Sequence, residues 1–152
     1  MATKGFVDYN ARRHIQYFAS GTMEKGQLVT INVHGYSGIA LEHANRYVVN
    51  GDPSGRIPIG LVEQKVVNYD LTRQKLNPFD PNEIQTGSKC SIIYDGWMHT
   101  NQISGSPTAG ASAYAAPNSC VSATQLNAGY ALVGKFLTAK DANGYAQVQI
   151  NL

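Results

Sequence analysis

Hydrophobic and polar residues alternate along this chain in short runs that end at turn signals. Residues 27–33 (QLVTINV) and 145–152 (YAQVQINL) alternate at every second position, which is typical of half-buried antiparallel strands. The apolar, β-branched run at residues 131–138 (ALVGKFLT) predicts another strand. Shorter strands are expected at residues 39–41, 47–49, 57–62, 66–71, around Tyr114 and at residues 120–124.

The 152 residues are enough for one domain with a real core, and no helix-length periodic pattern is present. The 15 glycines and 6 prolines are scattered between the apolar runs, as suits many short strands joined by turns. We therefore expect an all-β fold, a small β-barrel or β-sandwich of short antiparallel strands with an extended N-terminal arm. The expected arm covers residues 1–22, and a single β-rich domain covers residues 23–152.

The strongest local signal is a hairpin pattern between residues 87 and 101. Residues 89–94 predict an outgoing strand, Asp95 and Gly96 a two-residue turn, and residues 97–100 the return strand. Adjacent strand residues point to opposite faces, so Ile92 and Ile93 predict that both faces of this hairpin are covered. The cover comes from a second layer of the same chain or from another subunit.

Trp97 is the only tryptophan of the chain and begins the predicted return strand. Its large apolar area favours burial, so we expect it to be a structural anchor in the core or at a subunit junction. A place on a binding surface is the alternative.

The N-terminal segment mixes charges and aromatic rings without a clear period. Disordered tails are usually poor in aromatic residues, so this segment is expected to be an arm that docks on a neighbouring subunit or partner. Arg12 and Arg13, together with Lys4, are a weak signal for nucleic acid, and a net charge of +2 does not favour that partner. The expected contact residues are Phe6, Tyr9, Arg12, Arg13, Tyr17 and Phe18.

Charged residues make up only 14% of the chain, against about 25% in an average soluble domain. A neutral surface lowers the cost of desolvation on contact, which favours association with other protein. No apolar run approaches the roughly 18 residues of a membrane span, and the N-terminus lacks a signal-peptide core. We therefore expect no membrane partner.

Cys90 and Cys120 are expected to be reduced thiols, with a single disulfide as the alternative.

Motifs that carry chemistry are absent from the sequence. Neither a nucleotide-binding phosphate loop nor a Gly-x-Ser-x-Gly nucleophile turn is present. Neither cysteine is expected to act as a nucleophile, because both lie in strand-like runs, where buried inert thiols are the default. We therefore predict no enzymatic activity, no cofactor and no metal. The four histidines, none of which shows a metal-motif spacing, are His14, His34, His43 and His99.

Three segments together resemble the small head-decoration, or cement, proteins of tailed bacteriophages. They are residues 58–62 with 66–74, residues 96–101, and residues 133–137 with 141–148, so the resemblance covers about residues 57–152. It implies a β-rich, non-enzymatic protein on the capsid exterior of a virion assembled in the host cytoplasm. Its partners would be the major capsid protein and itself, often as a homotrimer that stabilises capsomer junctions. The alternatives are a phage tail, baseplate or fibre component, a carbohydrate-binding β-module, and a small hydrolase.

Overall fold

The structure is a computed structural model of the chain and describes residues 7, 10–31, 47–67 and 83–152. The strand predicted at residues 39–41 and the end of the one predicted at residues 66–71 lie outside the described residues.

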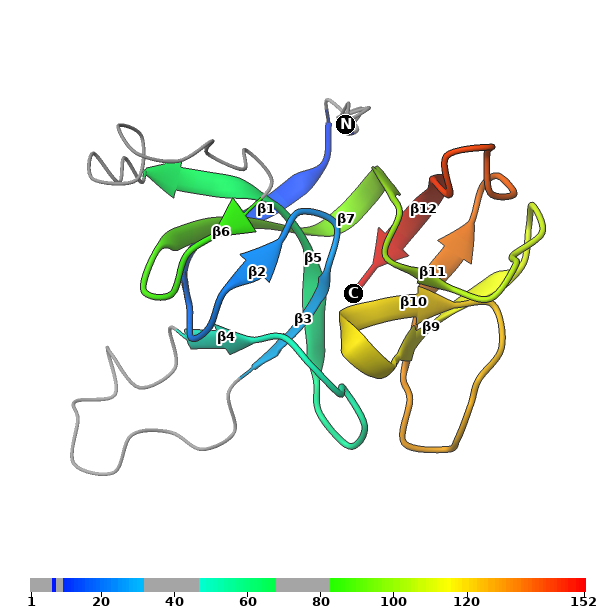
Figure 1. The fold of residues 1–152 in the computed structure, drawn as a ribbon, viewed down its shortest axis with the longest axis horizontal. Helices are drawn as coiled ribbons and strands as arrows, with labels where there is room; N and C mark the ends of the chain where they lie inside the picture. The colour runs from blue at the N-terminus through cyan, green and yellow to red at the C-terminus, as the bar shows by residue number, and fades with distance from the viewer. Residues whose placement is uncertain (1–6, 8–9, 32–46, 68–82) are drawn as a thin grey trace.

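The described residues form twelve strands and one 3-10 turn, and no α-helix occurs among them (Figure 1). The other predicted strands are confirmed within the described residues, except that residues 58–67 form one strand where two were expected. The strands are β1 (Arg12–Ala19), β2 (Met23–Glu24), β3 (Leu28–Ile31), β4 (Tyr47–Val49), β5 (Pro58–Val67), β6 (Glu83–Ile84), β7 (Lys89–Thr100), β8 (Ile103–Ser104), β9 (Ser112–Ala116), β10 (Cys120–Ser122), β11 (Leu132–Phe136) and β12 (Ala146–Asn151), and the turn is η1 (Pro117–Ser119).

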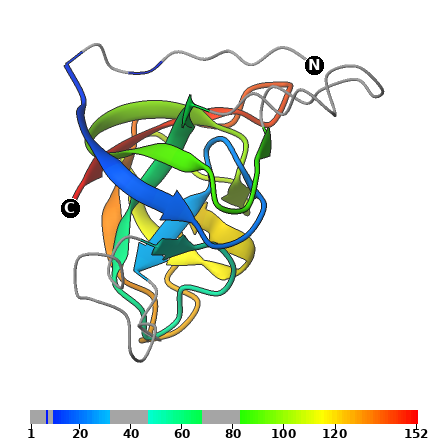
Figure 2. The ribbon, with the colours of Figure 1, turned by 90° about the vertical axis from the view of Figure 1, so that its left-hand side faces the viewer.

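Five strands close into a small barrel in the order β1-β4-β3-β5-β7 (Figure 2). The barrel closes because β1 pairs with β7 along one edge and with β4 along the other. Most neighbours are antiparallel, and only β1 and β4 run parallel within this barrel. The predicted small all-β barrel is therefore confirmed.

The second half of the molecule continues from the barrel through β7. The last residues of β7 pair with β12, and the sheet then proceeds through β11, β9 and β10 to β8. β8 follows β7 closely in the chain and pairs with β10 at the far end of this order. β7 is thus a wall strand of the barrel at one end and a strand of the second sheet at the other.

The predicted hairpin at Asp95 and Gly96 is wrong, because residues 89–100 form one continuous strand. Asp95 pairs with Arg12 of β1 and with Asn151 of β12, while Gly96 pairs with Ile150. A turn here would break these ladders, so pairing on both sides overrides the local turn preference of Asp-Gly. Gly96 keeps φ at 135°, a backbone conformation that glycine adopts readily, at the point where β7 passes between the two halves.

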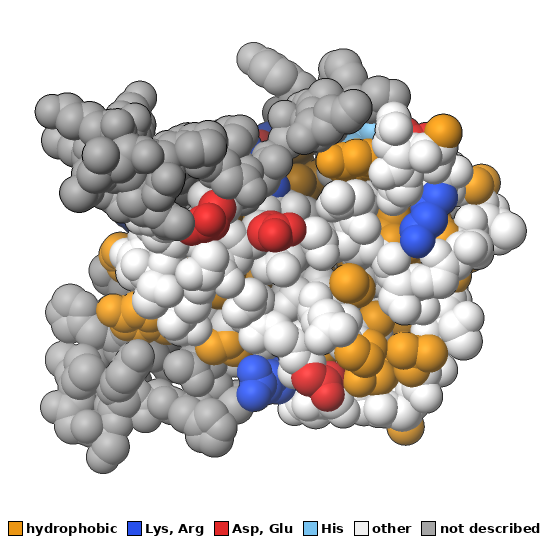
Figure 3. All heavy atoms as spheres, viewed as in Figure 1, with side chains coloured by type: hydrophobic (Ala, Val, Ile, Leu, Met, Phe, Trp, Pro, Cys, Tyr) orange, Lys and Arg blue, Asp and Glu red, His pale blue; other side chains and the backbone are white. Residues whose placement is uncertain are grey.

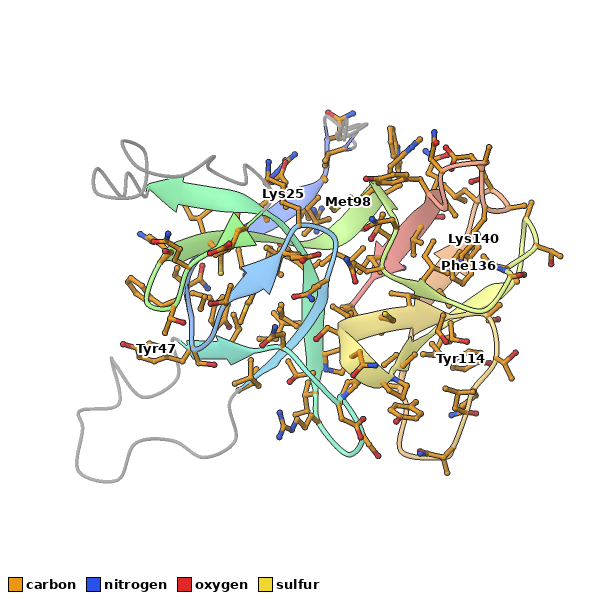
Figure 4. The ribbon with its side chains drawn as sticks, in the orientation of Figure 1. Lys25, Tyr47, Met98, Tyr114, Phe136 and Lys140 are labelled. Atoms are coloured by element: carbon orange, nitrogen blue, oxygen red, sulfur yellow. The ribbon has the colours of Figure 1, made fainter. Side chains whose placement is uncertain are left out.

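Two hydrophobic clusters lie on opposite sides of β7. Ile92 belongs to the barrel core, inside the barrel. Ile93 belongs to the second core, between the barrel wall and the second sheet. Both side chains are fully buried, which confirms that both faces of this strand are covered, here by the same chain. The barrel core also contains Val29, Val48, Val62 and Cys90, and the second core contains Leu28, Leu61, Met98, Phe136, Val148 and Ile150 (Figure 4).

The predicted arm over residues 1–22 is wrong for β1, because this strand belongs to the barrel. β1 has partly exposed side chains on both faces, which explains why its sequence lacks a clear period. A half-buried ion pair fixes it to the wall: Arg13 donates from Nε to a Glu63 carboxylate oxygen over 2.6 Å and from a second guanidinium nitrogen to the other oxygen over 3.1 Å. The hydroxyl of Ser91 donates to the same carboxylate over 2.9 Å. The three residues join β1, β5 and β7.

We expect Glu63→Gln to lower the free energy of unfolding by about 1–2 kcal/mol, because it weakens charge-assisted hydrogen bonds in a shielded place. The side chains of Arg13 and Glu63 are only 29% and 13% exposed. The matched control is Asp95→Asn, which removes the ion pair between Arg12 and Asp95, whose side chains are 72% and 44% exposed. It should cost less than about 0.5 kcal/mol. Urea unfolding measures the loss of free energy of unfolding in both variants. Equal losses would contradict the role of the Arg13–Glu63 ion pair in fixing β1 to the barrel.

We expect Gly60→Ala to destabilise the protein by about 3 kcal/mol or more, because β5 and β7 approach closely there. A Cβ at Gly60 would lie 2.0 Å from the backbone oxygen of Ile93. Gly87→Ala is the control, since nothing lies within 4 Å of its added Cβ and only its φ of +79° is unfavourable. The unfolding temperature of Gly60→Ala should be well below that of Gly87→Ala. The reverse order would refute the close approach of β5 and β7 at Gly60.

Candidate functional site

The residues predicted to dock on a neighbour make contacts within the chain wherever the structure describes them. Tyr17 packs against the barrel core, and the ring of Phe18 lies 6.0 Å from that of Tyr47 between centroids. Arg13 is held by its ion pair, whereas Arg12 is largely exposed. Arg13, Tyr17 and Phe18 thus have partners within the chain, but all three are only partly buried. Contact with a neighbouring subunit stays a prediction for them and for Arg12. Phe6 and Tyr9 lie outside the described residues.

His14 lies beside two aromatic rings on the same side of β1. Its ring stacks on Tyr94 with centroids 4.2 Å apart and meets Tyr17 edge-on at 5.6 Å. Partial burial removes water from the imidazole and lowers its pKa below the ordinary value. These contacts favour a neutral, packed histidine rather than a metal ligand.

Trp97 lies outside both cores, so the prediction that it anchors the core is wrong. Its neighbour Met98 points into the second core and is 5% exposed, which sends Trp97 to the opposite, half-buried face. There its ring lies 5.7 Å from that of His99 between centroids. The burial of Ile92 and Ile93 was predicted correctly, but the large apolar area of Trp97 did not place it in the core. A contact with another subunit stays a prediction.

Trp97 begins a row of side chains that crosses the outer face of the second sheet. Cross-strand pairing joins Trp97 to Gln149, Gln149 to Lys135, and Lys135 to Ser112. Val148 and Ile150 alternate with Gln149 and point into the core, so the polar row faces outward. This row is called the outer row below.

A hollow of about 390 Å³, in the size range of small-molecule sites, lies over three members of the outer row: Ser112, Lys135 and Gln149. Trp97, the fourth member, does not line the hollow and lies beside it, cross-strand from Gln149. The lining residues that matter here are Ser112, Leu132, Gly134, Lys135, Gln149 and Asn151. A Cβ at Gly134 would collide with the backbone oxygen of Gln149. Sequence reasoning missed this hollow. The amides at positions 147, 149 and 151 were visible as the polar side of an alternating strand, but the strands that lie next to them were not.

Two loops form a second distinct surface, at the lower end of the molecule in Figure 1. The amide of Gly55 donates to the carbonyl of Gly129 over 3.0 Å, which joins loop 50–57 to loop 123–131. Ile57 and Leu126, on these loops, are 63% and 52% exposed. We call this surface the loop end.

The two cysteines are free, as predicted. Burial raises the pKa of the Cys90 thiol to about 11, and Cys90 belongs to the barrel core. Cys120 is half-buried; burial also raises the pKa of its thiol, and the nearby charge of Lys140 partly opposes this. Neither thiol has the lowered pKa of a nucleophile.

Within the described part of the chain, no three or more His, Cys, Asp or Glu side chains gather as a metal site would need. No helix of that part is long and apolar enough to cross a membrane. Searches against models of known protein families and against curated proteins find no match for this chain.

We expect a thiol reagent at pH 8 to modify Cys120 in the native protein and to leave Cys90 untouched until the protein unfolds. With a pKa of about 11, only roughly one Cys90 in a thousand is ionised at that pH, and its thiol is also shielded from solvent. Thiol titration with and without denaturant measures both sites. The Cys120→Ser variant should show no fast-reacting thiol; a fast reaction in that variant would contradict the burial of Cys90.

Proposed function

We propose that this protein is a non-enzymatic structural protein of a tailed-phage virion, which binds the outer capsid and stabilises junctions between capsomers. The resemblance over about residues 57–152 points to this class. The observation that carries the proposal is the loop end, where two large apolar side chains project from a weakly charged surface. Its partners would be the major capsid protein and further copies of itself.

Hydrogen bonds within and between the two loops order the backbone of the loop end. Asp52 accepts a hydrogen bond from the amide of Ser54 over 3.0 Å, and Asn127 accepts one from the amide of Gly129 over 2.7 Å. Together with the bond between the two loops, these contacts hold the backbone around Ile57 in one conformation. A rigid surface loses less conformational entropy on binding than a mobile one.

The sparse charge of the surface supports protein contact. Figure 3 shows a face on which uncharged polar and hydrophobic atoms predominate and charged side chains are few. Interface cores are depleted of charged residues, because desolvating a charge is costly. A shell built from many copies multiplies a modest contact, so each interface needs only moderate affinity.

A bridging protein also needs a second contact surface, away from the first. Ile15 on β1 is 55% exposed, and β1 lies above the two loops in both ribbon views (Figures 1 and 2). The two cores lie on opposite faces of β7, so both halves of the molecule share this strand. This arrangement suits a protein that joins two neighbours, by contact with two capsomers or with a capsomer and another copy of itself.

We expect the purified protein to bind expanded capsids that lack it and to raise the temperature at which they rupture. Replacing both Ile57 and Leu126 by Ser should weaken binding at least tenfold, because burial of each side chain contributes about 1.5–3 kcal/mol. Leu137→Ser, at a site 36% exposed outside the loop end, is the control and should bind normally. Co-sedimentation and thermal rupture of the capsids provide the readouts.

Failure of the intact protein to bind capsids would refute the proposal. Labelling of virions with antibody to this protein separates the remaining possibilities: label on the head supports decoration, and label on the tail alone assigns the protein to the tail, baseplate or fibre.

A further inference from the structure

The outer row and its hollow are not needed for the contact at the loop end. They lie on the outer face of the second sheet, where β12 pairs with β7 and β11, and β11 pairs with β9. With strands about 4.8 Å apart, the row from Trp97 to Ser112 crosses three spacings, or roughly 14 Å. It is thus an elongated surface rather than a point.

The groups along this surface can bind hydroxyl-rich molecules. The amides of Gln149 and Asn151 both donate and accept hydrogen bonds, as does the hydroxyl of Ser112, and the ammonium of Lys135 donates. Trp97, cross-strand from Gln149, adds a large flat ring at one end of the row. Sugars combine an apolar C–H face with a rim of hydroxyl groups, which matches a ring beside amides.

The charge of the surface favours a neutral ligand over an anion. Lys135 is the only ionisable side chain among the described residues that line the hollow. Phosphate and carboxylate sites in proteins usually combine several charged donors, often with the paired nitrogens of an arginine. A single exposed lysine gives little preference for a polyanion.

A polypeptide fits this surface less well than a sugar. β11 and β12 are paired along both edges at the hollow, so neither offers a free edge for an added strand. Leu132, 57% exposed, is the one large aliphatic side chain among the described lining residues. A stable protein interface needs a larger apolar centre.

We propose that the hollow over the outer row, extended by the neighbouring ring of Trp97, is a binding site for a neutral oligosaccharide chain. Gln149 and Asn151 are its hydrogen-bonding residues, and Trp97 is a stacking platform for the part of the chain that reaches beyond the hollow. The inference does not depend on capsid binding, because it concerns the isolated protein.

The first test titrates the full-length protein with neutral hexasaccharides of α-linked glucose, β-linked glucose and N-acetylglucosamine. Because Trp97 is the only tryptophan, all tryptophan emission reports on this surface. We expect a saturable change in emission with at least one of these sugars, and a smaller or absent change with dextran sulfate. Calorimetry of Trp97→Phe, which keeps an aromatic ring, should show weakened but measurable binding.

Gln149→Ala should weaken sugar binding about five- to tenfold, the usual effect of losing one or two hydrogen bonds. Gln16→Ala is the matched control, an exposed glutamine on β1 in the other half of the molecule, and should bind as the unaltered protein does. Unchanged unfolding temperatures of both variants exclude a folding defect.

Three results would overturn the inference. No response to any neutral sugar at millimolar concentration refutes the site. A response to dextran sulfate alone assigns the surface to polyanions through Lys135. Loss of self-association in Gln149→Ala, measured by analytical ultracentrifugation and without sugar binding in the unaltered protein, makes the outer row a contact between copies.

Discussion

The fold depends on β7, a single strand that has a hydrophobic core on each side. Ile92 points into the barrel and Ile93 into the space between the barrel and the second sheet, and both are completely buried. A strand buried on both faces cannot lose a side chain on either face without opening a cavity, which commonly costs several kcal/mol. The two halves therefore share one wall and form one cooperative body.

This shared wall explains which predictions failed. Asp-Gly is a strong local turn signal, and residues 89–94 and 97–100 both read as strands. Whether the chain turns or continues at Gly96 depends on distant partners: β1 and β5 pair with β7 before this point and β12 pairs with it after. Local preference carries no information about those partners. The same reason places β1 in the barrel although its sequence lacks a clear period.

The sequence was most informative where one face of a strand meets solvent. β12 alternates cleanly, so Val148 and Ile150 were assigned to a buried face, and their complete burial agrees. Pro58 has no backbone N–H to donate to a ladder, which favours an edge, a strand start or a bulge, and it begins β5. Neither candidate surface could be found in this way. The outer row needs the register of four strands, and the loop end needs the contact between Gly55 and Gly129, residues far apart in the chain.

Rigidity links this architecture to the proposed roles. A protein that joins neighbours in a shell transmits force between its contact surfaces, and a hinge between them would yield before the contacts did. Here the two halves share β7. Its first part, residues 89–93, pairs with β5, and its second part, residues 95–100, pairs with β12. The ion pair of Arg13 and Glu63 fixes the strand that closes the barrel. The loop end and the outer row are therefore joined through the same wall, which suits the proposed contact of one surface with a shell and of the other with a sugar.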